Sequence, residues 1–563
     1  MKKFIFVMMI FFLFCTSVYA KSGSMKLLAV AGESSPKGSM ADLYLEIKEG
    51  SGRVFMDSFP LSKIDTQIST RFAKEVACNF LERDCSNYDF FYTIRANSAI
   101  IGGPSAGAAI TILTISVLDD LPLDNSATIT GTINTGGIIG PVGGIPQKIA
   151  AASETGLKKV LIPKYSQLNE TNISSYHATY NIKIVEVSDL SEAIKEMTGK
   201  DFNSYHDVNI SNSYLETMKI ISEDLCKRAE AISKEITQIG PNRTGTELLK
   251  KGKNALEIKQ YYSAASYCLG SGVDFRYLEI TNRGLSKEQI KNKIIETIDS
   301  VNEYKNATGK RQLKTITDLE TYMVVTDRLI EARDRLNDAL FYIAKDNINS
   351  SIYNLGYGIE RLNSGREWAE FFGKPGLTYN INKKVLDDSC LKKISEVEER
   401  IQYLELYLPS GTEDIKQAVK KSYEDYYEGN PELCLYKSSI AKAKVDSVLN
   451  TIAIDDKDIG KVIVDRLIIV KSILAKQSSR QVFPILAYSY YEYANSLKEN
   501  DPYAALLYLE YSIELGNLDI YFEKKKVPLP KITNILYVSI FLSGLFIGIA
   551  VGLIITRIRR KKR

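Results

Sequence analysis

A serine lies among small residues in the segment Gly103–Gly107, which reads GPSAG with Ser105 at its centre, and an apolar run follows directly. A serine hydroxyl is a weak nucleophile unless a neighbouring base removes its proton. Histidine is the usual base, but the sequence contains only two, His177 and His206, and both lie in polar stretches rich in Asn, Ser and Tyr. The segment therefore indicates a reactive serine only if another residue type supplies the base.

Lysine is the alternative base, because burial can lower its pKa from about 10.4 towards 7 or 8. Lys148 follows Gly143-Gly144 and Pro146. The glycines allow a tight turn and the proline suits a first helical turn, so we expect Lys148 on a short helix beside Ile149 and several alanines. By local sequence alone, this position is more typical of a solvated lysine.

Two linked segments resemble the proteolytic domain of the Lon peptidases, which are serine proteases with a Ser–Lys dyad. GPSAG matches the family's segment around the serine. Thr130–Pro163, TGTINTGGIIGPVGGIPQKIAAASETGLKKVLIP, carries the family's Thr-Gly pair, its Gly-Gly before the lysine and its closing GLKKVLIP. The resemblance covers about residues 25–200 and is densest over 102–163.

The resemblance implies a role for each residue of the predicted site. Ser105 would attack the scissile carbonyl, Lys148 would take its proton, and Thr130 would orient the lysine amine. Backbone N–H groups from Gly103 to Ala106, at a helix expected to begin at Ser105, would stabilise the oxyanion. A dyad of this kind needs no cofactor and no metal.

Two positions depart from the family pattern. Gly102 stands three positions before the serine, where family members usually carry an acidic residue, and Thr132 stands where many have Glu after the Thr-Gly pair. The active site is therefore expected to be arranged differently or to be weak. A tight strand-to-helix turn without catalysis is the structural alternative for the GPSAG segment.

The elements around these residues predict an α+β domain over residues 21–200. Polar and apolar residues alternate over 42–48, as in a half-buried strand, and 90–96 also reads as a strand. Residues 65–82 have apolar side chains four apart behind a candidate N-cap, Asp65, which predicts an amphipathic helix. Further strands and helices are expected at 127–132, 146–154, 158–163, 182–187 and 190–199.

Residues 205–530 follow a different pattern of long helices with many tyrosines. A helix, a tight polar turn and a second helix with small residues recur loosely, which favours helical hairpins that pack closely. The last copy resembles a tetratricopeptide unit, but the spacing is too loose for a regular array. We therefore expect an irregular all-α bundle or hairpin-repeat region.

Six cysteines lie outside the N-terminal apolar run, and an even number in an oxidising compartment favours disulfides. Nearest neighbours fall within the same predicted unit, so we expect the pairs Cys78–Cys85, Cys226–Cys268 and Cys390–Cys434. Free buried thiols are the alternative. Two histidines and no CxxC motif argue against a zinc site.

Both ends of the chain resemble membrane-targeting segments. Residues 1–20 read as a signal peptide, with an uncleaved anchor as the alternative, and residues 535–555 form an uncharged stretch long enough to span a bilayer. The basic tail, 556–563, would stay in the cytoplasm. These features predict a single-pass type I cell-membrane protein with an extracellular ectodomain.

Two routes to self-association are predicted. Gly544, Gly548 and Gly552 form a face suited to helix–helix contact within a membrane. Lon-like domains generally form rings, which implies a hexamer through the α+β domain.

The charge of the chain and the motifs that its sequence lacks narrow the range of expected functions. The chain has 72 basic and 68 acidic residues, but eight basic ones lie in the two ends, so the remainder is slightly acidic and nucleic acid is not an expected partner. The sequence contains no GxxxxGK[ST] phosphate-binding loop. We therefore expect an ATP-independent, membrane-anchored serine endopeptidase that cleaves flexible or unfolded polypeptides. The alternatives are a non-catalytic receptor or scaffold with a relic Lon-like domain, and a self-processing protein.

Overall fold

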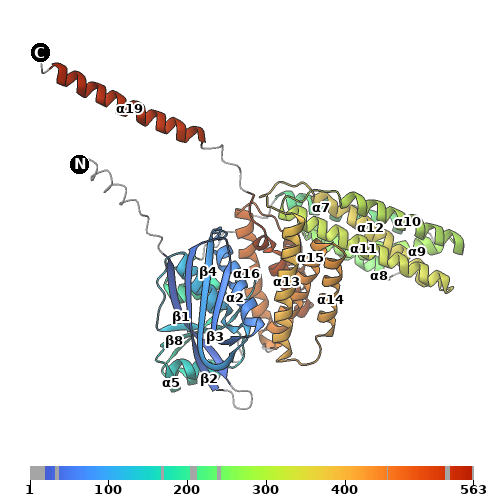
Figure 1. The fold of residues 1–563 in the computed structure, drawn as a ribbon. Coiled ribbons are helices and arrows are strands. Elements are labelled where there is room, and N and C mark those ends of the chain that lie inside the picture. The colour runs from blue at the N-terminus through green and yellow to red at the C-terminus, as the bar shows by residue number, and fades with distance from the viewer. Residues whose placement is uncertain are drawn as a thin grey trace. The chain divides into compact units, whose positions relative to one another are not determined.

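The computed structural model describes residues 20–31, 37–165, 170–202, 212–236, 243–452, 454, 456–525 and 533–560. The predicted signal peptide, except for Ala20, lies outside these residues. The chain up to Phe522 forms one compact unit, and Glu523–Arg563 forms a second. The first unit contains an α/β region followed by a helical region, as Figure 1 shows.

The α/β region is built on a sheet whose described strands lie in the order β1, β2, β4, β3. Antiparallel pairing joins the first three and β3 runs parallel to β4; buried Leu43 pairs with buried Ile94 in the centre. A parallel sheet has the order β5, β8, β9, and β6 pairs with β7. The bounds are β1 Lys21–Ala31, β2 Lys37–Glu49, β3 Val54–Ser62, β4 Tyr88–Ile101, β5 Ala127–Ile129, β6 Thr132–Ile133, β7 Ile139–Gly140, β8 Lys159–Pro163 and β9 Lys183–Val187.

Helices pack on these sheets to make the core of the α/β region. Every residue of α3 (Gly107–Leu118) is buried, because the helix is apolar on all sides. The predicted start at Ser105 is two residues early, since Pro104–Ala106 form a 3₁₀ turn, η1, before α3. The other helices are α2 (Ile64–Phe80), α4 (Ile145–Glu154), α5 (Glu170–Tyr180) and α6 (Leu190–Thr198).

The helical region forms the predicted bundle around an extended apolar core, to which Ile138 of the α/β region also contributes. Small residues bring helices together: a Cβ on Gly358 would lie 2.7 Å from the Leu336 side chain of the neighbouring helix. The helices are α7 Asn212–Glu235, α8 Arg243–Glu257, α9 Tyr261–Asn282, α10 Lys287–Thr308, α11 Ile316–Ala344, α12 Ile348–Trp368, α13 Lys383–Glu405, α14 Glu413–Tyr427, α15 Pro431–Ile452, α16 Ile459–Ser479, α17 Ile485–Leu497 and α18 Pro502–Leu515.

Three disulfides confirm the nearest-neighbour prediction. Cys78–Cys85 ties the end of α2 to the loop before β4, Cys226–Cys268 joins α7 to α9, and Cys390–Cys434 joins α13 to α15. Each bridge therefore links neighbouring elements within one region, and none of the three crosses between the α/β and helical regions.

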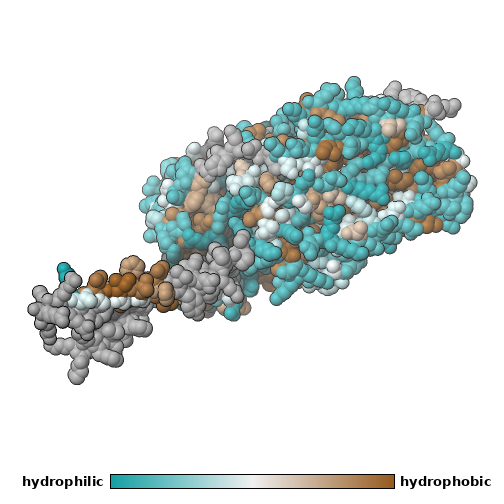
Figure 2. Space-filling view, turned by 90° about the horizontal axis from the view of Figure 1, so that it is seen from above, coloured by the Kyte–Doolittle hydropathy of each residue, from teal (hydrophilic) through white to brown (hydrophobic). Residues whose placement is uncertain are grey.

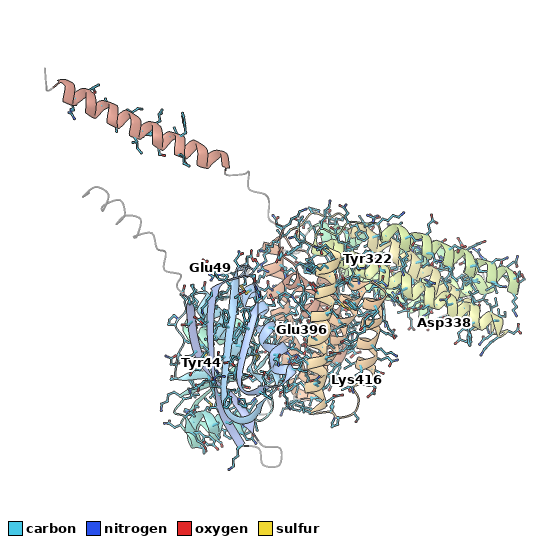
Figure 3. The ribbon with its side chains drawn as sticks, in the orientation of Figure 1. Tyr44, Glu49, Tyr322, Asp338, Glu396 and Lys416 are labelled. Carbon is cyan, nitrogen blue, oxygen red and sulfur yellow. A yellow bond between two sulfur atoms is a disulfide. The ribbon has the colours of Figure 1, made fainter. Side chains whose placement is uncertain are left out.

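The two regions of the first unit pack directly against each other. Helix α13 lies beside α2 (Figure 1), and Glu396, labelled on α13 in Figure 3, helps line a small cavity with Ile68 and Phe72 of α2. Lys476 of α16 donates to the carbonyl oxygen of Phe80 at 3.0 Å. Helices α13 and α16 therefore hold the helical region against α2, the helix that connects β3 to β4.

The second unit contains α19 (Thr533–Arg560), with exposed apolar side chains such as Phe541 and Phe546; Figure 2 shows this helix largely in hydrophobic colours. A bilayer span needs about 20 consecutive predominantly apolar residues. Within the described ranges, no helix combines the length and the apolarity that a membrane crossing requires. The predicted transmembrane helix at 535–555 is therefore wrong, as are the membrane localisation, the type I orientation and the intramembrane contact through Gly544, Gly548 and Gly552 that depended on it.

Candidate active site

Ser105 lies in η1, between the end of β4 and the start of α3. Gly103, with φ of 98°, adopts a conformation that few side-chain-bearing residues tolerate, and it turns the chain into η1. The carbonyl oxygen of Ser105 accepts the N–H of Gly131 at 3.0 Å, and Ala108 N–H donates to the carbonyl of Gly131 at 3.0 Å. These paired bonds fix Ser105, which is half-buried, against the segment that carries Thr130.

Lys148 lies in the first turn of α4. The turn before it is made by Gly144, which has φ of 67° and serves as the N-cap. The Lys148 side chain is only 3% exposed, and its Nζ donates to Thr130 Oγ1 at 3.1 Å. Burial lowers the pKa of the Lys148 amine to about 7. An amine with this pKa is substantially neutral near pH 7 and can accept a proton.

The Thr130 hydroxyl connects the lysine to the serine segment. It is buried, and it donates to the Ser105 carbonyl oxygen at 3.4 Å while accepting from Lys148 Nζ. This direction of bonding uses an N–H of the amine and leaves the lone pair of a neutral lysine free. In the described part of the chain, no hydrogen bond joins the Ser105 hydroxyl directly to the Lys148 amine. Catalytic hydrogen bonds commonly tighten only when substrate binds.

The proposed oxyanion donors lie at the start of this turn, and one of them already holds an anionic group. Gly103 N–H donates to Asp65 Oδ2 at 2.9 Å, and Ala106 ends η1 just before α3. Asp65 was predicted to be the N-cap of α2, but the helix begins at Ile64 and its N-cap, Lys63, makes no side-chain cap. Sequence reasoning missed the Asp65–Gly103 contact because it joins residues 38 positions apart.

Helix α13 of the helical region contacts the loops on both sides of the site. Arg400 Nη2 donates to the carbonyl oxygen of Ile133 at 2.6 Å, and the hydroxyl of Tyr403 accepts the N–H of Gly143 at 3.1 Å. Ile133 follows the Thr130 segment, and Gly143 precedes the turn that carries Lys148. The helical region therefore supports the loops that position both residues, which no local pattern in the sequence indicated.

No metal or histidine chemistry is apparent in the residues that the structure describes. Within them, no group of three His, Cys, Asp or Glu side chains could hold a metal ion. His177 lies on α5, where its Nδ1 pairs with the carbonyl oxygen of Ile182 at 2.8 Å, and His206 lies outside the described residues. Ser105, Lys148 and Thr130 come together at one site, while their catalytic roles remain predictions.

The segment that forms this site is similar to segments of known proteins. Residues 82–199 match the family model of the Lon protease (S16) C-terminal proteolytic domain. An archaeal Lon protease of Archaeoglobus fulgidus is 31% identical over 196 residues, which cover 33% of this chain and 29% of the relative. Lon protease 2 of Bacillus subtilis is 43% identical over 82 residues, or 15% of each chain.

A further archaeal Lon protease, from Methanothermobacter thermautotrophicus, is 34% identical over 112 residues, which cover 20% of this chain and 17% of the relative. The chain therefore spans less than a third of the length of these relatives. Within that span, the family match supports a serine-type peptidase with the proteolytic domain of the Lon proteases.

Proposed function

We propose that this protein is an ATP-independent serine endopeptidase in which Ser105 and Lys148 form the catalytic dyad. The observation that carries the proposal is the Lys148 amine, which is buried, has a pKa of about 7 and bonds to a threonine that also contacts the serine segment. A solvated lysine at the same position would be protonated and could not act as a base near neutral pH.

The proposed reaction begins with attack of Ser105 Oγ on the scissile carbonyl carbon while the hydroxyl proton passes to neutral Lys148 Nζ. The Lys148 ammonium then gives this proton to the leaving amine nitrogen as the C–N bond breaks. Lys148 then takes a proton from water, whose oxygen attacks the acyl carbon. As the ester C–Oγ bond breaks, the Lys148 ammonium returns the proton to Ser105 Oγ and the acyl group leaves as a carboxylic acid. Thr130 acts through Lys148, because its Oγ1 accepts an N–H of the amine and fixes the direction of the lone pair.

We place the oxyanion site at the backbone N–H groups from Gly103 to Ala106. The bond from Gly103 N–H to the Asp65 carboxylate supports this assignment, since the same donor can stabilise a negatively charged oxygen. In the proposed cycle, the substrate oxyanion displaces Asp65 from Gly103 N–H. In the resting enzyme, the Asp65 carboxylate would thus accept the Gly103 hydrogen bond that the substrate oxyanion accepts during catalysis.

The proposed substrates are flexible or unfolded polypeptides. The sequence contains no phosphate-binding loop that would power unfolding, so the chain must enter the site already extended. The loops on both sides of the site are held in place by α13. Assembly into a ring through the α/β region is part of the proposal and rests on the family resemblance.

The direct test incubates the purified full chain with a reduced, alkylated protein in the absence of nucleotide. The parent should cleave it, and Ser105→Ala and Lys148→Ala should each lower the rate by about a thousandfold or more. Lys158→Ala is the matched control, because this lysine is exposed and close in sequence, and it should leave the rate unchanged. Equal cleavage by the parent and the two dyad variants would contradict the proposal.

The alternative function is a non-catalytic receptor. One observation favours it: within the described residues, the Lys148 amine bonds to Thr130 and no hydrogen bond joins it to the Ser105 hydroxyl. A receptor would bind the unfolded chain equally well with and without Ser105→Ala, and neither form would release fragments.

Self-processing is the third possible function. Mass spectrometry of the purified protein would then show a shortened product that the Ser105→Ala variant lacks.

A further inference from the structure

A cavity of about 460 Å³ lies inside the helical region. Helices between α7 and α18 supply its lining, and among the described residues no lining side chain comes from the α/β region. The cavity is therefore separate from the Ser105 site, and an inference about it goes beyond the proposed peptidase function. Its volume lies within the range of about 300–1,000 Å³ typical of small-molecule sites.

The cavity lining has a strong excess of positive charge. Asp327 is the one acidic residue in the lining, against five basic ones. Two of the five have carboxylate partners outside the lining, since Arg361 pairs with Glu331 and Lys437 pairs with Asp425 at 2.6 Å. The other three, Arg328, Lys421 and Lys444, form no ion pair within the described residues.

Arg328 is the most unusual of these three residues. Its guanidinium lies 4.9 Å from the ring centroid of Trp368, and its Nε is buried with no hydrogen-bond partner. Burial and the nearby charge of Arg361 lower the pKa of Arg328, which shows that its surroundings disfavour the charged form. Asp327 acts on Arg328 together with Lys437 and Arg361, so one carboxylate is shared among three cations and offsets only part of the desolvation of the Arg328 guanidinium. An anion in the cavity would offset the remainder.

Aromatic rings form another part of the wall. Tyr262 packs edge-on against Trp368 at 6.1 Å, and Tyr490 contacts Tyr508 at 5.6 Å and Tyr511 at 5.4 Å. Such rings offer flat apolar surface for a ligand body, and their hydroxyls can bond to polar groups at its edge. Cationic and aromatic groups thus line the same cavity.

We propose that this cavity binds an organic anion, in which a carboxylate or phosphate head pairs with Arg328 and an aromatic or aliphatic body packs against the tyrosines and Trp368. Lys444, half-buried on α15, and Lys421, exposed on α14, add positive charge around the head. A guanidinium suits both kinds of head because its planar N–H groups match two oxygens at once. Asp327 opposes a second negative charge near the head, which favours the carboxylate.

Trp368 makes binding directly measurable. It is the only tryptophan in the sequence and lies on the cavity wall, so the fluorescence of the full chain reports on this site. Phenylacetate, phenyl phosphate and benzyl alcohol share a ring and differ in their heads. The two anions should give saturable changes in fluorescence and benzyl alcohol should not. A stronger response to phenylacetate than to phenyl phosphate identifies a carboxylate site, and the reverse identifies a phosphate site.

Substitutions distinguish a charge-recognising site from a merely aromatic one. Arg328→Gln should weaken binding of the preferred anion at least tenfold, whereas Arg333→Gln, an exposed arginine on the same helix, should leave it unchanged. If Arg328→Gln alters the circular dichroism spectrum, Lys444→Gln replaces it, with an expected loss of severalfold. Equal binding of benzyl alcohol, no response to any probe, or unchanged binding in both variants would overturn the proposal.

Discussion

At the scale of single residues, the chemistry depends on a threonine hydroxyl that contacts two segments. Thr130 Oγ1 lies 3.1 Å from Lys148 Nζ and 3.4 Å from the Ser105 carbonyl oxygen. Replacement with valine keeps the shape of the side chain but removes both bonds. The lysine amine would then lose its fixed orientation while remaining buried.

Thr130→Val should therefore lower kcat by about ten- to a hundredfold, an effect of the size expected for a lost positioning bond. Thr130→Ser keeps the hydroxyl and should restore most of the rate. The pH dependence of kcat should also shift in Thr130→Val, because a hydrogen-bond partner of the amine is gone. Equal rates in both variants would show that the hydroxyl has no positioning role.

Burial of Lys148 is expected to favour activity and, at the same time, to lower the stability of the folded state. The pKa of Lys148 falls from 10.5 to about 7 on folding, so the folded state disfavours the charged amine that the unfolded chain carries. The resulting loss of stability is complete below pH 7, declines between pH 7 and 10.5, and vanishes above that range. Its upper bound is about 5 kcal/mol at the low-pH end.

Lys148→Met should thus be inactive yet more stable than the parent at pH 6. Chemical denaturation at pH 6 and pH 10 tests this prediction, and the advantage of the variant should shrink at the higher pH. Lys158→Met, at an exposed position, provides the comparison and should change stability little at either pH. A Lys148→Met variant that is less stable than the parent at pH 6 would mean that burial of the amine does not destabilise the folded state.

At the scale of elements, α13 connects the helical region to the loops of the site. The Tyr403 hydroxyl accepts Gly143 N–H at 3.1 Å and also lies 3.0 Å from the Tyr407 hydroxyl. Gly143 precedes the left-handed turn that starts α4, so this bond acts on the placement of Lys148. Tyr403 lies 260 positions away along the chain.

Tyr403→Phe should lower kcat/KM severalfold and destabilise the fold by about 1 kcal/mol, the usual effect of one lost hydrogen bond. Tyr423→Phe removes a similar bond, which joins α14 to Glu398 of α13 and does not involve the loops of the site, and should affect stability alone. Initial rates and denaturation midpoints measured for the two variants separate these effects. Parallel losses of activity in both would argue that α13 has no specific influence on the site.

The sequence predicted elements well where one face is buried. β2 and β4 alternate because one face meets the core, and α3 is apolar on all sides because it lies inside the α/β region. The edge strand β3 escaped prediction, since none of its residues is fully buried and its apolar side chains fall on both faces. The start of α3 was misplaced because Pro104–Ala106 turn into a 3₁₀ segment before it.

The residues of the site also differ in how far the sequence predicted them. The motif segments predicted Ser105, Thr130 and Lys148, which lie together, because each sits in a compact pattern with its own local signal. Asp65 and the α13 residues could not be predicted, since their contacts with the site join distant positions and depend on packing alone.

At the scale of the whole molecule, one buried charge cluster joins the α/β region to three helices. Glu514 on α18 contacts Lys393 of α13 at 2.8 Å and Lys442 of α15 at 2.6 Å, and it accepts the hydroxyl of Thr135 at 3.1 Å. Although burial acts to raise the pKa of Glu514, the two ammonium groups lower it to about 2. Its contribution to stability is therefore present above pH 4.5 and is lost as the pH falls towards 2.

Glu514→Gln should destabilise the protein by about 3–5 kcal/mol at pH 7, because two buried lysines lose their shared anion. Glu413→Gln, at an exposed position on α14, should have little effect. Thermal denaturation at pH 7 measures both variants. A stability loss of similar size in the two would mean that the cluster adds nothing beyond surface charge.

The pH dependence of kcat/KM for cleavage of an unfolded polypeptide tests the central claim most directly, namely that Lys148 is the base for Ser105. Measured from pH 5 to 10 on the parent chain, kcat/KM should rise with pH and level off, with a midpoint near 7 that reflects deprotonation of the buried amine. Lys148→Ala should abolish this rise together with the activity. A midpoint near 10, or turnover that persists in Lys148→Ala with the same pH profile, would contradict the account.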